Sequence, residues 1–235
     1  LLPVLAFRLR GPEEDVELAD LGLVHRVAVE LSKRGQVQLC YKKMARTPRN
    51  AVGDMVYHVL NRANGRMQIF RTDRDYQAFV SLLREAKEKY PMRILSYCLM
   101  PNHWHLLLYP RNDNDMPHFM RWLGLTHTQR WHAAHKTVGY GHLYQGRYKS
   151  FPVQTDEHFL QVARYIERNP LRARLVITAH AWRWSSLWLR TKGTKQQRQL
   201  LDPWPVPAGQ NYTAWVNQRQ SPEEVEVIRY AIKRG

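Results

Sequence analysis

The sequence is poor in cysteine and contains no long hydrophobic run. Its two cysteines, Cys40 and Cys98, are too few for a disulfide framework or a four-cysteine zinc site, so a reducing, cytoplasmic setting is expected. No apolar stretch approaches the roughly 20 residues that cross a bilayer. The apolar start is interrupted by Arg8 and Arg10 and is followed by no cleavage pattern. We therefore expect neither a signal peptide nor a membrane partner.

Acidic residues are also scarce. The 235 residues include 20 Asp and Glu against 36 Lys and Arg, which gives a formal net charge of +16. Residues 44–143 carry fourteen basic and seven acidic side chains, and residues 144–198 carry eleven and three. Such an excess favours a polyanionic partner, usually nucleic acid. The alternative is a solubilising charged surface.

The hydrophobic periodicity predicts alternating strands and helices from about residue 54 onward. Strands are expected over 55–60, 92–100, 103–109 and 147–153, and helices over 73–90, 116–135 and about 156–166. We expect Asp73 to cap the first helix and Thr155 or Asp156 to cap the third. This order indicates an α+β fold of ferredoxin-like type, in which the two main helices cover one face of an antiparallel sheet and a further helix follows.

The two ends of the chain differ from this central part. Residues 1–43 show only a weak helical pattern, at 24–31, and are expected to be an N-terminal extension before a native start at Met44. Residues 44–190 form the predicted main domain. Residues 191–235 are expected to be a basic linker, a proline-rich connector and a C-terminal helical tail, with a C-terminal piece missing.

Two histidines begin the third predicted strand. His103 and His105 lie two residues apart and therefore share one face, while Trp104 points to the opposite face. Two imidazoles in this arrangement can chelate one divalent ion. The pattern is short, however, and two partly exposed histidines at a strand start are the alternative.

The third predicted helix ends in a second candidate group. Tyr165 and Asn169 are four residues apart and so lie on one helical face. The amide oxygen of Asn169 can bind a hard cation, and Tyr165 would then lie one turn away as a nucleophile. A core tyrosine and a helix-ending Asn before Pro170 are the alternatives.

Several stretches together resemble the REP-associated tyrosine transposases, a subgroup of the single-tyrosine transposases with a His-hydrophobic-His (HUH) motif. The similarity spans Met44 to about Leu189, and the matching stretches keep their order along the chain. They are Tyr57-His58-Val59 with Asn61-Arg62, the run from Cys98 to His105, the run from Gly141 to Tyr148, the run from Arg164 to Ala173, and Trp182 to Ser186.

The resemblance implies a fold, an activity and a set of site residues. It implies a ferredoxin-like sheet with a nucleophile-bearing helix and an enzyme that cuts single-stranded DNA beside a palindromic hairpin. His103, His105 and Asn169 would hold Mg²⁺ or Mn²⁺, and Tyr165 would form a 5′-phosphotyrosine and release a 3′-hydroxyl. Relatives occur as monomers and dimers, so the oligomeric state stays open.

The surroundings supply candidate DNA contacts. Basic side chains that border the site in sequence suit phosphate contacts: Arg147, Lys149, Arg164, Arg168, Arg172 and Arg174. Tyr144, Tyr148, Trp182, Trp184 and Trp188 can stack on bases or pack in the core, and core packing is favoured for Trp104, Trp122 and Trp184. His58 and Asn61 are candidates for supporting the ligand histidines, although His58 also suits an ordinary place on an apolar strand face.

Three other functions remain open at this level. One is a domesticated protein that binds hairpin DNA without cutting it. Another is a nuclease that uses metal-bound water, with Tyr165 serving structure alone. The last is an RNA-binding α+β domain, which ranks lowest because no RRM-type aromatic motif is present. In each case the protein would be cytoplasmic and, when bound to DNA, associated with the nucleoid.

Overall fold

The computed structural model describes residues 27–31, 37–41, 51–153 and 156–234. The chain divides into two compact units, Leu1–Arg49 and Asn50–Gly235. The first contains an antiparallel pair of strands, β1 (Val27–Leu31) and β2 (Val37–Tyr41). The helix pattern at 24–31 was therefore misleading, because alternating Val and Leu at 27, 29 and 31 suits a strand. None of the described helices is both long and apolar enough to span a membrane.

A four-stranded antiparallel sheet forms the centre of the second unit. Its strands are β3 (Val56–Arg62), β4 (Met92–Met100), β5 (His103–Pro110) and β6 (Lys149–Val153). They lie in the order β4-β5-β3-β6. This is the order that a ferredoxin-like βαββαβ chain produces, so the predicted fold class is confirmed.

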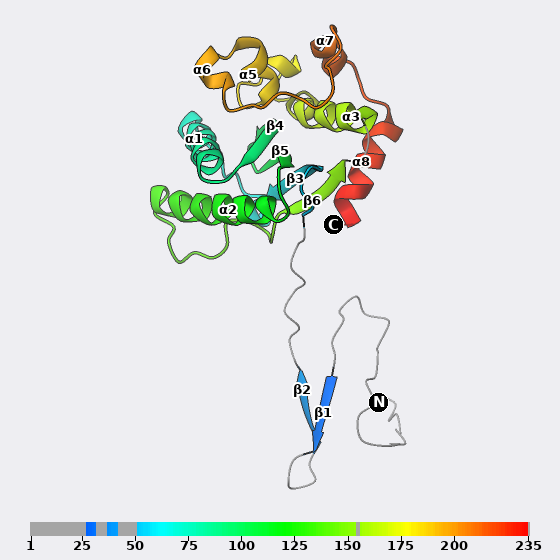
Figure 1. The fold of residues 1–235 in the computed structure, drawn as a ribbon. Helices are drawn as coiled ribbons and strands as arrows, with labels where there is room; N and C mark the ends of the chain where they lie inside the picture. Colours follow the sequence, from blue (N-terminus) through cyan, green and yellow to red (C-terminus); the bar gives the residue numbers. More distant parts are fainter. Residues whose placement is uncertain (1–26, 32–36, 42–50, 154–155, 235) are drawn as a thin grey trace. The chain divides into compact units, whose positions relative to one another are not determined.

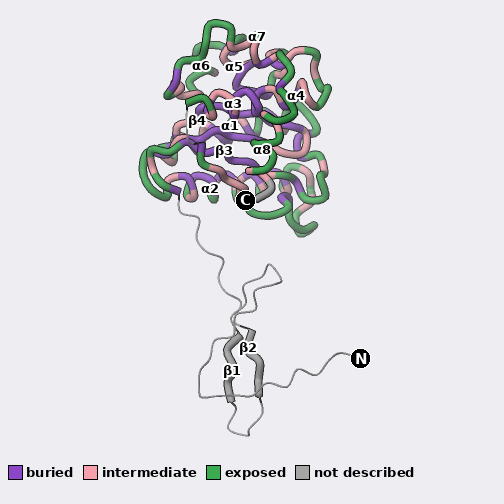
Figure 2. The backbone as a smooth tube through the Cα atoms, turned by 90° about the vertical axis from the view of Figure 1, so that its right-hand side faces the viewer, coloured by how far each residue is buried: buried purple, intermediate pink, exposed green. Residues whose placement is uncertain are grey.

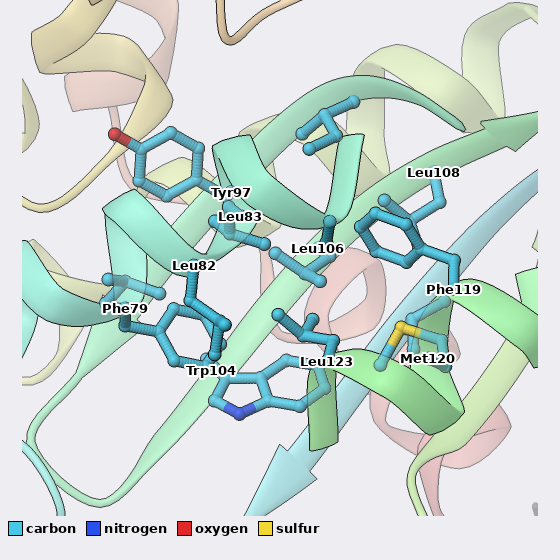
Figure 3. Close-up of a cluster of buried hydrophobic side chains, with 14 of the residues drawn as sticks. Phe79, Leu82, Leu83, Tyr97, Trp104, Leu106, Leu108, Phe119, Met120 and Leu123 are labelled. Atoms are coloured by element: carbon cyan, nitrogen blue, oxygen red, sulfur yellow. The ribbon is translucent and has the colours of Figure 1, made fainter. Parts of the chain in front are cut away.

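Helices α1 (Asp73–Lys89) and α2 (Asp115–Ala134) cover one face of this sheet (Figure 1). Alternation along β5 directs Trp104, Leu106 and Leu108 toward them. Figure 3 shows these side chains among those of both helices, and Trp104 is only 1% exposed. This face is a dry core, as predicted for Trp104.

The opposite face packs against α3 (Asp156–Glu167) and α8 (Pro222–Arg234). Leu107 of β5 and Cys98 of β4 contact the apolar side of α3 there. Figure 2 shows buried positions running through the strands and the inner sides of the helices. Since His103 and His105 alternate with Trp104, they belong to this second face.

The first helix is capped by a different residue from the one expected. Thr72 is the N-cap, and a capping box joins it to Asp75. The Asp75 carboxylate accepts hydrogen bonds from the backbone nitrogens of Arg71 and Thr72, both at 2.9 Å. Asp73 is the first helical residue, where its charge suits the helix dipole. Thr155, one of the two caps proposed for α3, lies outside the described residues.

The C-terminal part is more ordered than the predicted linker. It contains α4 (Asn169–Arg172), α5 (Ser186–Lys192), α6 (Lys195–Arg198) and α7 (Tyr212–Asn217), with a short 3-10 turn at Ala179–Ala181. Another 3-10 turn, at Asn64–Arg66, follows β3. The basic stretch 191–198 was expected to be a linker, but its second half is helical because Thr194 and Gln197 form a capping box. Residues 202–208 contain neither helix nor strand, as the prolines predict.

Candidate active site

The sheet holds the two histidines of the HUH motif side by side. His103 and His105 project from β5 on the α3 face, with ring centroids 5.1 Å apart. His105 is 3% exposed, whereas His103 at the strand start is partly exposed. The pair therefore lies at the edge of a buried surface that solvent can still reach.

Each of these rings uses its Nδ1 atom within the protein. His105 Nδ1 lies 2.9 Å from Nε2 of His58, and His103 Nδ1 lies 2.6 Å from Oδ1 of Asn102. An amide oxygen only accepts, so His103 Nδ1 carries the proton and donates it. If His105 Nδ1 donates to His58 in the same way, both Nε2 atoms are lone-pair donors. Metal-binding histidines are commonly oriented through the other ring nitrogen in this manner.

Burial keeps these histidines neutral. It lowers the pKa of His58 to about 3, with a further lowering by His158. Burial likewise lowers the pKa of His103 to about 3, with smaller contributions from Arg62 and Arg172. The pKa of His105 is lowered well below its usual value, chiefly by burial. Neutral imidazoles are the form that binds a metal ion.

Arg62 is a neighbour that the sequence reasoning did not single out as a site residue. It pairs with His103 in the register of β3 and β5, and therefore lies on the same face. Its side chain is exposed. The pairing of β3 with β5 was the only signal for it, and spacing along the chain does not contain that information.

Helix α3 brings Tyr165 to the histidines from 60 residues further along the chain. The Tyr165 ring centroid lies 6.0 Å from that of His105 and 6.1 Å from that of His58. Tyr165 is 5% exposed. The structure thus places the ring of the expected nucleophile beside His105, one of the two HUH histidines, and beside His58.

Asn169 lies one turn beyond Tyr165, at the start of α4, and is 5% exposed. Its Nδ2 donates to the carbonyl oxygens of Tyr165 and Ile166, at 3.2 and 3.3 Å. Its Oδ1 accepts a hydrogen bond from Arg172. This amide closes the end of α3, and Oδ1 keeps one lone pair for another partner.

The candidate metal ligands are two neutral imidazoles and one amide oxygen. In the part of the chain that the structure describes, no three side chains from His, Cys, Asp and Glu gather to hold a metal. The side-chain oxygen of Asn169 belongs to a class of ligand that hard cations accept. Two imidazoles with one amide leave positions for water or phosphate oxygen.

The six basic residues proposed to bind DNA divide into two groups. Arg147 and Arg174 are exposed. The other four have protein partners. Lys149 Nζ donates to the Ile232 carbonyl at 2.8 Å, and Arg168 Nε donates to the Gln218 carbonyl at 2.7 Å. Arg172 lies over the Tyr165 ring, with its guanidinium carbon 4.2 Å from the centroid.

Arg164 differs most from its expected place. It is 3% exposed, pairs with Glu224 at 3.5 Å and donates to the Gln218 carbonyl at 3.0 Å. Its guanidinium also lies 4.4 Å from the centroid of the Trp215 ring. These contacts tie α3 to α7 and α8, so Arg164 holds the C-terminal helices and does not face solvent.

Asn61 and Tyr144 are directed away from the histidines. Asn61 pairs with Trp104 in the β3–β5 register, which puts it on the α1–α2 face, and its Nδ2 donates to Gly146 O at 3.3 Å. Tyr144 is buried, and its hydroxyl accepts a hydrogen bond from Trp104 Nε1 at 2.8 Å. Tyr144 therefore packs in the core.

Glu167 is a second residue that the sequence reasoning missed. It is fully buried, two residues after Tyr165. Its carboxylate accepts hydrogen bonds from Ser96 at 3.1 Å, Ser186 at 2.5 Å and Tyr212 at 2.9 Å, and it forms an ion pair with Arg190. These bonds join α3 to β4, α5 and α7. The sequence alone does not reveal this role, because a Glu on an amphipathic helix usually faces solvent.

Comparison with known proteins shows the family and the fold of this chain. The model of the family described as IS200-like transposases matches residues 51–169. A solved structure of a REP-associated tyrosine transposase bound to a REP hairpin superposes with a TM-score of 0.50 at 18% identity, over 76% of this chain and 99% of that one.

A protein from Deinococcus radiodurans assigned as a transposase superposes with a TM-score of 0.37 at 23% identity, over 54% of this chain and 95% of that one. No curated protein matches the sequence. The first likeness supports the shared fold, and the family model covers just over half of the residues. The chain therefore belongs to the IS200-like transposase family.

Proposed function

We propose that the protein is a metal-dependent transposase that nicks and rejoins single-stranded DNA beside a hairpin formed by a palindromic repeat. The observation that carries this proposal is the approach of Tyr165 to His105 of the HUH motif, with 6.0 Å between the two ring centroids. A tyrosine next to a neutral histidine that can hold a metal ion suits attack on a phosphodiester whose charge is balanced at that ion.

In this proposal His103 and His105 would hold Mg²⁺ or Mn²⁺ through Nε2, and Asn169 would hold it through Oδ1. Such an ion would supply polarisation of the scissile phosphate and neutralisation of the developing charge. His58 and Asn102 keep the two imidazoles in the required orientation and tautomer through their bonds to Nδ1.

Tyr165 performs the bond exchange. Its hydroxyl oxygen forms a bond to phosphorus, and the bond from phosphorus to the 3′ oxygen breaks. The tyrosine hydroxyl loses one proton and the leaving 3′ oxygen gains one. The products are a 5′-phosphotyrosine and a free 3′-hydroxyl. Because the phosphodiester energy stays in the covalent link, the same hydroxyl or another 3′ end can reverse the step.

Hairpin DNA is the partner that the observations favour. The structural neighbour was solved bound to a REP hairpin. The exposed Arg147 and Arg174, together with the net charge of +16, supply cations for phosphates. Single-stranded DNA at the foot of such a hairpin would expose the scissile phosphate to Tyr165.

The test is denaturing electrophoresis after incubation with labelled hairpin DNA that carries the palindromes flanking the gene and single-stranded tails. Wild-type protein with Mg²⁺ or Mn²⁺ should form a covalent protein–DNA band that EDTA abolishes. Tyr165→Phe should lose the band, and Tyr140→Phe, at an 85% exposed tyrosine, should keep it.

Two outcomes would contradict the proposal. Cleavage that persists in Tyr165→Phe and leaves a free 5′-phosphate would indicate a hydrolytic nuclease. Binding of several hairpins without cleavage would indicate a domesticated DNA-binding protein.

A further inference from the structure

A cavity of about 430 Å³ opens between α4 and α8, beside the helix end that carries Asn169. Residues 219–222 and the first turns of α8 form one wall, and Arg168 and Arg172 form the other. The two walls are about 50 residues apart in sequence. Four of the lining residues are arginines: Arg168, Arg172, Arg219 and Arg229.

The positive charge of this cavity is largely uncompensated. Glu226 is the one acidic residue on its lining. Among the described residues, the ion pairs of the protein include none for these four arginines. Burial lowers the pKa of Arg168, and its arginine neighbours Arg164, Arg172 and Arg219 lower it further. A cluster of like positive charges of this kind favours the binding of an anion.

Two lining side chains have hydrogen-bonding atoms without a partner. Gln220 is 4% exposed, and both its Nε2 and its Oε1 are buried and unpaired within the described structure. Nη1 of Arg172 is also buried without a partner. Such atoms carry a desolvation cost unless a ligand satisfies them. The amide Nε2 of Gln220 and the guanidinium groups are donors that suit the acceptor oxygens of a phosphate.

Arg172 also connects this cavity to the proposed nucleophile. Its guanidinium carbon lies 4.2 Å from the centroid of the Tyr165 ring, and the same group donates to Oδ1 of Asn169. A group bound in the cavity through Arg172 would therefore lie next to the reacting centre. Arg168 and Arg172 were among the sequence-predicted DNA contacts, whereas none of the residues of the opposite wall, in α8 and the preceding loop, was.

We propose that this cavity binds a backbone phosphate of the DNA strand adjacent to the scissile phosphate, held by Arg172, Arg219, Arg229 and Gln220. The inference rests on the proposed function, because it takes single-stranded DNA as the substrate. Phosphate contacts of this kind set register without reading sequence. The bound phosphate would fix which phosphodiester reaches Tyr165.

The test measures binding of the full-length protein to fluorescent single-stranded DNA by anisotropy, in EDTA so that cleavage does not occur. The Arg219→Gln/Arg229→Gln double variant should bind several-fold more weakly and should lose about 0.7 from the salt slope per phosphate contact removed. The matched control is Arg121→Gln, at an exposed arginine of α2 on the other face of the sheet, and it should bind like wild type.

A second variant separates binding from folding. Gln220→Glu adds a carboxylate among the arginines, so it should unfold at the same or a higher temperature than wild type and still bind DNA more weakly. Unchanged affinity in this variant, or affinity of the double variant equal to that of Arg121→Gln, would overturn the inference.

A third comparison identifies the source of the phosphate. The oligonucleotides in this comparison each carry one neutral methylphosphonate in place of a phosphate. Replacement at one linkage should weaken binding by the wild-type protein, and replacement at the same linkage should leave binding by the double variant unchanged. If inorganic phosphate competes but no linkage shows this coupling, the cavity binds free phosphate and the inference is wrong. These readouts need no cleavage, so they stand or fall separately from the Tyr165→Phe experiment.

Discussion

At the scale of single residues, the hydrogen bond from each HUH histidine determines which ring nitrogen is left for a ligand. We expect His58→Ala to raise the metal concentration for half-maximal adduct formation by roughly 10–100-fold, because His105 loses the partner of its Nδ1 atom. Saturating metal should restore most of the activity. Titration of adduct yield with Mn²⁺ measures this effect. An unchanged titration, identical to that of His118→Ala at an exposed position, would show that His58 only fills space.

His127 is one of several buried histidines through which acid lowers stability. It is 5% exposed, its Nδ1 lies 2.6 Å from the Tyr144 hydroxyl, and burial lowers its pKa to about 3. Below pH 6.5 the unfolded chain takes up a proton that folded His127 does not, so stability falls as the pH falls from 6.5 toward 3.

We expect His127 alone to cost about 2 kcal/mol of unfolding free energy between pH 6.5 and pH 5. Urea unfolding at a series of pH values measures this, and His127→Gln should reduce the pH dependence by about that amount while the other buried histidines keep the remainder. If the free energy of unfolding depends on pH equally in wild type and in His127→Gln, groups other than His127 cause the dependence.

At the scale of elements, α3 must be held at a fixed depth for Tyr165 to meet the histidines. Glu167 supplies this through its bonds to three elements, including the ion pair with Arg190. Glu167→Ala removes the carboxylate that accepts from Arg190 and from three hydroxyl groups. We expect it to lower the free energy of unfolding by roughly 3 kcal/mol, since breaking a buried pair costs more than the pair contributes.

Denaturant unfolding with a matched variant at exposed Glu157 on the same helix tests this expectation. Glu157→Gln should change stability by no more than about 0.5 kcal/mol. Equal effects of the two substitutions would show that the buried network does not anchor α3.

At the scale of the second unit, the sheet separates stability from chemistry. The face under α1 and α2 is an apolar core (Figure 3), whereas the face under α3 and α8, two helices seen in Figure 1, carries the histidines and Tyr165. With a net charge of +16, we expect DNA affinity to depend strongly on salt.

Raising KCl from 50 to 200 mM should weaken binding of single-stranded DNA roughly a hundredfold, the effect of several phosphate contacts. Anisotropy titrations over this range provide the slope. A nearly flat response would mean that the positive charge serves solubility alone.

Local patterns were enough to predict the order and class of the elements. Alternation placed His103 and His105 opposite Trp104, and the 3.6-residue period placed Tyr165 and Asn169 together, because both regularities act between neighbours along the chain. Two wrong predictions, the cap of α1 and the linker at 195–198, also have local causes. Capping boxes at Thr72 and Thr194 start the helices there.

Contacts between distant segments were decided by the tertiary structure alone. The sequence by itself determined the βαββαβ order, the basic charge and which residue types can perform the chemistry. Only folding decided that His58 supports His105, that Arg164 and Glu167 are buried anchors, and that Arg219 and Arg229 line a cavity with Arg172. These relations join residues 20 to 70 positions apart, and strand register and helix packing, not periodicity, bring such residues together.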